Sequence, residues 1–303
     1  DAVKFQSFKA ENLATKQAQK AMYQKETTNI EESQFDMLKK LELSTEMHKQ
    51  LISYCKKKKI IFLSSPFDHE SIELLEDLGL EIFKIPSGEI TNLPYLRHIG
   101  KLNKKIILST GMSNMDEVKN AFDILINSGT KKNNITILHA NTEYPTPMKD
   151  VNLRAMVSIG KELDIKFGYS DHTLGIEVAI AAVALGASVI EKHFTLDRNG
   201  GGPDDSFSLE PSDLVSLCQD SQSAWEARGE VGYGLKESEV PNLQFRRSLY
   251  YMADLKKGMI LEKTHFRSIR PGYGIPPKYS DFVIGKQLKE DVVANTPMSF
   301  ADF

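Results

Sequence analysis

Residues 166–193 read KFGYSDHTLGIEVAIAAVALGASVIEKH, and this stretch decides the fold. Two short runs rich in apolar residues, Lys166 to Ser170 and Ser188 to His193, flank a segment with helical periodicity from Gly175 to Leu185. A strand, a helix and a second strand in this order are typical of a parallel sheet wound with helices. Further strands are predicted at Ala2 to Gln6, Ile60 to Ser64, Ile82 to Pro86, Lys105 to Thr110 and Ile135 to Ala140, and further helices at Ser71 to Leu78, Met115 to Asn127 and Pro211 to Gly229.

The strand runs of this pattern number seven. A closed barrel of alternating strands and helices takes eight strands, whereas an open sheet would leave two edges unpaired. We therefore predict an α/β fold, a (β/α)8 TIM barrel, with about one further βα unit before Asp1. The polar segment from Phe8 to Gln34 is expected to form a loop over the mouth of the barrel.

The pattern changes after Gly229, so residues 1–229 are predicted to form the barrel domain. Residues 230–245 are rich in Gly, Glu and Asn with little periodicity, which predicts a linker. Residues 246–303 contain short alternating runs such as Ser248 to Met252, together with Gly- and Pro-rich turns. This composition predicts a small β-rich second domain.

Composition excludes several classes of protein. The chain has 303 residues, 41% of them hydrophobic, and a formal net charge of -3 with no basic stripe, so a nucleic-acid partner is not expected. No apolar run approaches the roughly 20 residues of a membrane span. The N-terminal residues do not resemble a signal peptide, and Cys55 and Cys218 each lie in a helix-like pattern that suits buried thiols. We therefore expect a cytoplasmic protein without membrane contact.

Two histidines end neighbouring strands of the predicted barrel, His172 and His193. Active sites of such barrels lie at the C-terminal ends of the strands, so both imidazoles could face one point. Two imidazoles with the remaining positions left to water or substrate suit manganese, magnesium or cobalt better than a closed zinc site. The alternative is that each histidine only hydrogen-bonds a loop carbonyl.

Two lysines, Lys4 and Lys84, also lie near strand ends. Burial of an ammonium group near a barrel axis is unfavourable unless an anion meets it, which predicts a pocket for phosphate or carboxylate. The alternative is a pair of internal ion pairs with Glu89 or Glu191. Further donors to the anion are expected from the hydroxyl groups of Ser65, Ser87 and Ser170.

Position alone leaves two roles open for each of two carboxylates, Glu89 and Asp204. Glu89 follows its strand and could be a general acid or base, or could cap Thr91 and Asn92. The Gly-rich stretch from Asn199 to Asp205 does not have the spacing of a phosphate-binding loop and is interpreted as a flexible lid. Asp204 within this stretch could contact sugar hydroxyls or could be a turn residue.

Several motifs together resemble one family. They are Val3-Lys-Phe-Gln, Ser64-Ser-Pro-Phe-Asp, Phe83-Lys-Ile-Pro-Ser-Gly-Glu-Ile-Thr-Asn-Leu-Pro, Leu108-Ser-Thr-Gly-Met, Glu143-Tyr-Pro-Thr-Pro, Gly168-Tyr-Ser-Asp-His-Thr and Ile190-Glu-Lys-His-Phe-Thr. In this order they resemble the N-acetylneuraminate (sialic acid) synthases and their legionaminic-acid relatives. The strings Lys256-Lys-Gly and Ile269-Arg-Pro-Gly-Tyr-Gly resemble the antifreeze-like (SAF) domain that follows the barrel in this family.

The resemblance implies a transferase reaction in which phosphoenolpyruvate condenses with an open-chain N-acetylated amino sugar. The sugar would be N-acetylmannosamine or a 6-deoxy-2,4-diacetamido analogue, and the products a nonulosonic acid and phosphate. A divalent metal, manganese above magnesium or cobalt, would bind His172 and His193 and polarise the aldehyde. C3 of phosphoenolpyruvate would attack the aldehyde carbon, water would add at C2, and phosphate would leave. The residues implied to hold phosphoenolpyruvate are Lys4, Ser65, Lys84, Ser87, Thr142, Tyr144 and Ser170.

The resemblance also implies roles for the other candidates. Gln6, Tyr144 and Asp204 would contact the sugar, and Glu89 and Lys84 would be the catalytic residues, with Glu89 transferring a proton. Arg270 would reach the barrel of the partner subunit in a domain-exchanged homodimer. The chain departs from the family at residues 200–207, GGGPDDSF, where Ser-Gly-Pro-Asp-His is more usual, and it lacks the Glu-Ile-Gly-x-Asn-His motif of the family's first strand.

Two other interpretations remain open from the sequence. The first is another phosphoenolpyruvate-dependent sugar-acid synthase on the same barrel, acting on a phosphorylated aldose. It would require extra arginines for the distal phosphate, whereas the strand ends carry lysines and hydroxyls. The second is a catalytically inactive sugar-binding relative.

Overall fold

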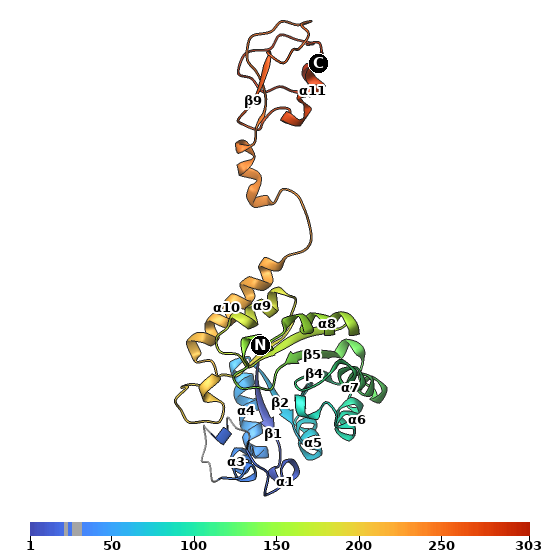
Figure 1. Ribbon diagram of the computed structural model, residues 1–303, viewed down its shortest axis with the longest axis vertical. Coiled ribbons are helices and arrows are strands. Elements are labelled where there is room, and N and C mark those ends of the chain that lie inside the picture. The colour runs from blue at the N-terminus through green and yellow to red at the C-terminus, as the bar shows by residue number, and fades with distance from the viewer. Residues whose placement is uncertain (21–23, 26–31) are drawn as a thin grey trace. The chain divides into compact units, whose positions relative to one another are not determined.

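Figure 1 shows the computed structural model, which describes residues 1–303 except 21–23 and 26–31. The chain divides into two units, Asp1–Gly229 and Glu230–Phe303. No helix in the described part of the chain combines the length and the apolar character that crossing a membrane requires.

The first unit is built on parallel strands, seven within its described residues. They are β1 (Ala2–Ser7), β2 (Ile61–Pro66), β3 (Ile82–Ile85), β4 (Lys105–Ser109), β5 (Ile135–Ala140), β6 (Lys166–Asp171) and β7 (Ile190–Lys192). β1 pairs with β2, β3 to β7 pair in sequence order, and β2 lies beside β3. The curled parallel sheet confirms the TIM-barrel prediction, and the strand bounds differ from those predicted mainly at β7, which is shorter.

Helices surround this sheet (Figure 1). They are α1 (Ala10–Leu13), α3 (Gln34–Leu41), α4 (Thr45–Lys58), α5 (His69–Asp77), α6 (Leu93–Lys101), α7 (Met115–Ser128), α8 (Leu153–Leu163), α9 (Glu177–Ala184) and α10 (Pro211–Arg228). Local sequence fixes several starts. The side chain of Asp68 accepts from the Ser71 backbone N–H and caps α5, and Asn114 and Glu117 form a reciprocal capping box at α7.

The main hydrophobic core lies between the sheet and these helices. Alternate strand residues such as Phe83, Ile85, Ile106 and Leu108 are buried against apolar side chains of α5, α6 and α7. Full burial of each such side chain stabilises the fold by roughly 1.5–3 kcal/mol. Because strand residues alternate between faces, the intervening residues point into the barrel, where the candidate site lies.

The structure corrects three details of the sequence analysis. The segment Phe8 to Gln34 was predicted as a loop, but it contains the short helix α1, and its residues 21–23 and 26–31 lie outside the described part. The predicted linker 230–245 contains a 3₁₀ helix, Glu237–Phe245, which begins where the Lys236 backbone N–H donates to Glu239. Cys55 is buried as expected, whereas Cys218 on α10 is exposed.

The second unit has a small core of its own. Strands β8 (Ser248–Tyr251) and β9 (Phe266–Ile269) pair antiparallel, and a short helix, α11 (Ser280–Val283), follows. Isolated bridges such as Leu255 to Val292 extend the pairing. The core comprises Leu249, Tyr251, Leu255, Leu261, Phe266, Ile275, Val283, Leu288 and Met298. This unit is therefore the small β-rich module that its sequence predicted.

Candidate active site

Strand register brings polar residues together on the inner face of the barrel. Paired residues of parallel strands point to the same face, as do residues two apart along one strand. Followed from β3 to β7, this rule places polar side chains on the face opposite the hydrophobic core. Those toward the C-terminal ends of the strands include Lys84, Ser109, Ser170 and Glu191. In β1 and β2, the pair Gln6 and Ser65 lies on the same face as Lys4.

Glu191 links both candidate lysines. Its Oε2 lies 3.1 Å from Lys4 Nζ, and its Oε1 lies 3.1 Å from Lys84 Nζ. Ser170 Oγ donates a 2.7 Å hydrogen bond to the same Oε1. The ion-pair alternative is therefore present, with Glu191 as the acid, but two ammonium groups and one carboxylate leave one net positive charge in the pocket.

Burial controls the charges of this network. Burial, reinforced by the charge of Lys4, lowers the pKa of Lys84 to about 8, although Glu191 acts in the opposite direction. Burial alone would raise the pKa of Glu191, but the charges of Lys84 and Lys4 outweigh it and hold that pKa well below its ordinary value. At neutral pH Glu191 is therefore ionised and Lys84 is mostly protonated.

Two buried hydroxyls on the same face have no hydrogen-bond partner among the described residues, those of Ser65 and Ser109. Buried polar groups are nearly always satisfied, so an unpaired one calls for an explanation such as a ligand. Both hydroxyls stand near the ends of their strands: Ser65 pairs with Gln6, and Ser109 lies two residues beyond Ile107, the register partner of Lys84. Both hydroxyls are therefore available to donate to a ligand in this pocket.

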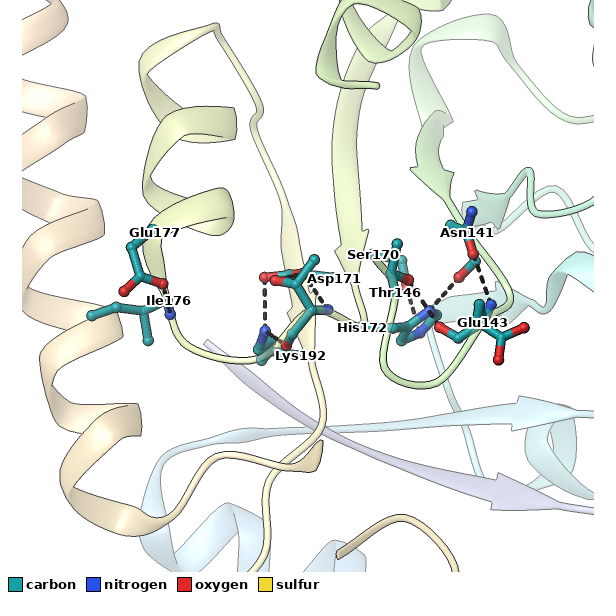
Figure 2. Close-up of polar contacts among 10 residues, drawn as sticks. Asn141, Glu143, Thr146, Ser170, Asp171, His172, Ile176, Glu177 and Lys192 are labelled. Atoms are coloured by element: carbon teal, nitrogen blue, oxygen red, sulfur yellow. Dashed lines mark hydrogen bonds and ion pairs between the residues drawn. The ribbon is translucent and has the colours of Figure 1, made fainter. Parts of the chain in front are cut away.

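The two histidines lie side by side at the ends of β6 and β7. Their ring centroids are 5.4 Å apart, with the ring planes at 74°. Figure 2 shows how His172 is held: its Nδ1 lies 2.6 Å from the Asn141 carbonyl oxygen, and its own carbonyl accepts from the Thr146 N–H. Because a carbonyl only accepts, Nδ1 carries the proton and Nε2 keeps its lone pair.

The donor set fits a metal site of two imidazoles. Burial lowers the pKa of His172 to about 4, so its ring is neutral, as a metal ligand must be. The one hydroxyl hydrogen of Ser170, 3.5 Å from His172 Nε2, goes to Glu191, so the Nε2 lone pair stays available. Within the described residues no cluster of three or more His, Cys, Asp or Glu side chains suits a metal.

An ion pair on the outer side of the sheet lies directly behind the histidines. Asp171 and Lys192 are register partners whose side chains meet at 2.8 Å, and both are almost completely buried. Figure 2 shows the contact between Asp171 and Lys192. Lys192 also donates to the Thr173 carbonyl, and Asp171 accepts from the Thr173 N–H and hydroxyl. These bonds fix the turn that carries His172 to the strand that carries His193.

Gly111 brings two more predicted residues together. Its backbone N–H donates a 2.9 Å hydrogen bond to Ser87 Oγ. A Cβ at position 111 would lie 2.5 Å from Thr142 Cγ2 and 2.8 Å from Ser87 Oγ, closer than atoms approach without displacement. A larger residue at position 111 would therefore displace the side chains of Ser87 and Thr142, which both lie against this glycine.

Two aromatic side chains, Tyr144 and Phe207, lie close to the histidine rings. The Tyr144 ring lies 4.3 Å from the His172 ring and 6.0 Å from the His193 ring, centroid to centroid. Phe207 lies 5.3 Å from the His193 ring. Asp204 Oδ2 lies 3.3 Å from His193 Nδ1, so this carboxylate faces an imidazole.

The remaining candidates are Glu89, Gln6 and Arg270. Glu89 Oε2 accepts a 2.6 Å hydrogen bond from the Asn92 side-chain amide, so the predicted contact with Asn92 is present. Gln6 is exposed at the end of β1. Arg270 is exposed in the second unit, whose position relative to the barrel is not defined.

Sequence reasoning missed the roles of three groups of residues. Glu191 appeared only as an alternative partner of the lysines, Ser109 was not selected, and Asp171 with Lys192 had no role. The strand-end positions of Ser109 and Glu191 were visible signals. The Asp171–Lys192 pair required the strand register, which no local pattern supplies.

Comparisons with known proteins show the family of the chain. Residues 1–233 match the NeuB family and residues 246–303 match the SAF domain. The chain is 52% identical over 296 residues to N,N'-diacetyllegionaminic acid synthase of Campylobacter jejuni, covering 96% of this chain and 89% of that protein. It is 40% identical over 301 residues to the synthase of the same name from Legionella pneumophila, covering 98% and 85%.

A solved structure is similar as well. The N-acetylneuraminic acid (sialic acid) synthetase of Leptospira borgpetersenii, crystallised with citrate, superposes with a TM-score of 0.69 at 29% identity. The superposition covers 81% of this chain and 80% of that one.

Proposed function

Because the chain belongs to the NeuB family, we propose that it is a transferase that condenses phosphoenolpyruvate with an open-chain N-acetylated amino sugar to give a nonulosonic acid and phosphate. One observation carries the proposal. Lys4 and Lys84 share one carboxylate beside two imidazoles, so a pocket with net positive charge adjoins a candidate metal site.

The donor would bind at the lysine end of the pocket. Phosphoenolpyruvate carries a phosphate and a carboxylate, and charge-assisted hydrogen bonds from buried ammonium groups suit both. Lys84 lies deepest and Lys4 nearer the opening, since their side chains are 3% and 24% exposed. Additional donors would be the hydroxyls of Ser65, Ser87, Ser109, Thr142 and Ser170.

His172 and His193 would hold a divalent ion, with manganese favoured over magnesium or cobalt. A bound ion would supply Lewis-acid polarisation of the sugar aldehyde. The Asn141 carbonyl fixes the His172 tautomer, and Asp204 Oδ2 lies 3.3 Å from His193 Nδ1, so an oxygen atom stands at Nδ1 of each ring. Tyr144, packed against His172, would limit the access of water to this end of the pocket.

The second substrate would lie between the histidines and the mouth. The proposed contacts are Gln6, Tyr144, Asp204 and, from the partner subunit of a domain-exchanged homodimer, Arg270. Glu89 is the proposed proton-transfer residue, with Oε2 held by the Asn92 side chain and Oε1 as the oxygen that would exchange the proton. Two relatives that cover nearly the whole chain are named N,N'-diacetyllegionaminic acid synthases. We therefore favour a 6-deoxy-2,4-diacetamido sugar over N-acetylmannosamine.

The proposed compartment is the cytoplasm. Cys55 and Cys218 are both free thiols, which persist most readily under reducing conditions. The names of the Campylobacter jejuni and Legionella pneumophila relatives contain no phosphorylated sugar, so they favour the main proposal over the alternative that acts on a phosphorylated aldose.

A turnover assay tests the proposal. The protein is incubated with phosphoenolpyruvate, Mn²⁺ and each amino sugar in turn, and phosphate release and the mass of the product are measured. We expect phosphate release that requires both substrates and the metal, with faster turnover of the diacetamido sugar. Binding of a sugar without phosphate release under any of these conditions would identify an inactive relative and contradict the proposal.

A further inference from the structure

Glu191 stands at the centre of the inner network although it is not among the proposed substrate contacts. Its two oxygens contact groups from three other strands: Lys4 on β1, Lys84 on β3 and Ser170 on β6. Its side chain is only 17% exposed. No other described carboxylate lies within ion-pair distance of either lysine.

The arrangement solves a problem of charge and geometry. Two ammonium groups that bind one small anion must lie near each other, and like charges in a poorly solvated pocket repel. Each oxygen of Glu191 accepts from one lysine at 3.1 Å, so the carboxylate keeps the ammonium groups close while giving each a separate place. Ser170 fixes the carboxylate itself through Oε1.

We propose that Glu191 is the positioning residue of the donor site, which holds Lys4 and Lys84 in the geometry that receives phosphoenolpyruvate. This inference rests on the proposed function. Its main competitor is a role in charge compensation alone, in which any negative charge at this position would serve.

Two substitutions separate positioning from charge. Glu191→Gln keeps the length of the side chain but offers one accepting oxygen and a donor NH₂, which cannot accept from a second ammonium group. Glu191→Asp keeps the charge but is one methylene shorter, so its two oxygens cannot reach the positions at which those of Glu191 contact Lys4 and Lys84. Positioning predicts weaker donor binding in both variants. Charge compensation alone predicts near-normal binding for aspartate. Glutamine also removes the charge that raises the pKa of Lys84, so weaker binding is expected from either role in this variant, whereas tighter binding would contradict positioning.

The test is calorimetric titration of phosphoenolpyruvate into the whole protein without the sugar. The matched control is Glu162→Gln, which removes a carboxylate from an exposed ion pair with Lys119. We expect the Kd of both Glu191 variants to rise about tenfold or more, equivalent to about 1.4 kcal/mol. The control should bind as the wild type does. A melting temperature and a Mn²⁺ titration near wild-type values would show that the rest of the site is intact.

Each outcome has one meaning. A rise clearly below tenfold in Glu191→Asp, or tighter binding in Glu191→Gln, overturns the positioning role. If the glutamine variant does not fold, the aspartate variant alone decides. Failure of the wild-type protein to bind phosphoenolpyruvate would instead refute the proposed function, so the two failures are distinguishable.

Discussion

Replacement of the two lysines by methionine should weaken phosphoenolpyruvate binding to very different extents. Methionine keeps the apolar stem and removes the ammonium group, so packing is largely retained. In either variant Glu191 keeps the other lysine and Ser170 as partners, so no isolated buried charge is created. Both variants should therefore fold.

The expected magnitudes follow from burial. A charge about 4 Å from an anion contributes about 4 kcal/mol at an effective dielectric constant of about 20, and about 1 kcal/mol in bulk water. Lys84 is 3% exposed, so its loss should approach the larger figure after some relaxation, about 2–4 kcal/mol, or roughly 30- to 1,000-fold in Kd. Lys4 is 24% exposed and better screened, and its loss should cost about 1 kcal/mol, roughly fivefold.

Calorimetric titration with phosphoenolpyruvate measures both variants, with Lys119→Met as a control at an exposed ion pair. Melting temperatures establish that the variants are folded. Binding by Lys84→Met within twofold of the wild type, or a larger loss in Lys4→Met than in Lys84→Met, would refute the assignment of Lys84 as the deep ammonium of the donor site.

Other residues give three further predictions. His172→Ala should abolish metal-dependent turnover and weaken Mn²⁺ binding at least tenfold with the fold retained; wild-type turnover in this variant would contradict the ligand assignment. The kcat/KM for phosphoenolpyruvate should fall as pH rises through about 8, because Lys84 there loses the proton that binds the anion. In Lys84→Arg the kcat/KM should stay constant to higher pH, because arginine keeps its charge. A pH profile unchanged by this replacement would exclude Lys84 as the cause. Lys192→Met leaves Asp171 buried without its partner and should destabilise the protein by about 3–5 kcal/mol in urea unfolding, and a loss below about 1 kcal/mol would argue against the buried pair.

The barrel could be predicted from the sequence because its signal is local. Short apolar runs alternate with helical periodicity, and the structure confirms every predicted strand of the first unit to within about two residues at either end. The same logic located the site, because strand ends of a parallel barrel converge. His172 with His193 and Lys4 with Lys84 were selected in this way, and the structure brings each pair together.

Partnerships across the barrel could not be predicted. The acid that meets the lysines is Glu191 on β7 rather than Glu89, which is nearer to Lys84 in sequence, because the choice depends on which side chains point inward across the barrel.

The exposure of Cys218 was also missed. Helix α10 buries only Leu217 completely, and its weak amphipathic pattern does not show which side faces the barrel.

The central claim is that one pocket holds a metal ion on two imidazoles beside an anionic donor on two ammonium groups. Crystals soaked with Mn²⁺ and phosphoenolpyruvate, with an anomalous difference map collected, would test it directly. The account predicts a manganese peak bound by His172 Nε2 and the His193 ring, with donor density against Lys84. A manganese peak away from both histidines, or donor density at the opposite end of the barrel, would contradict it.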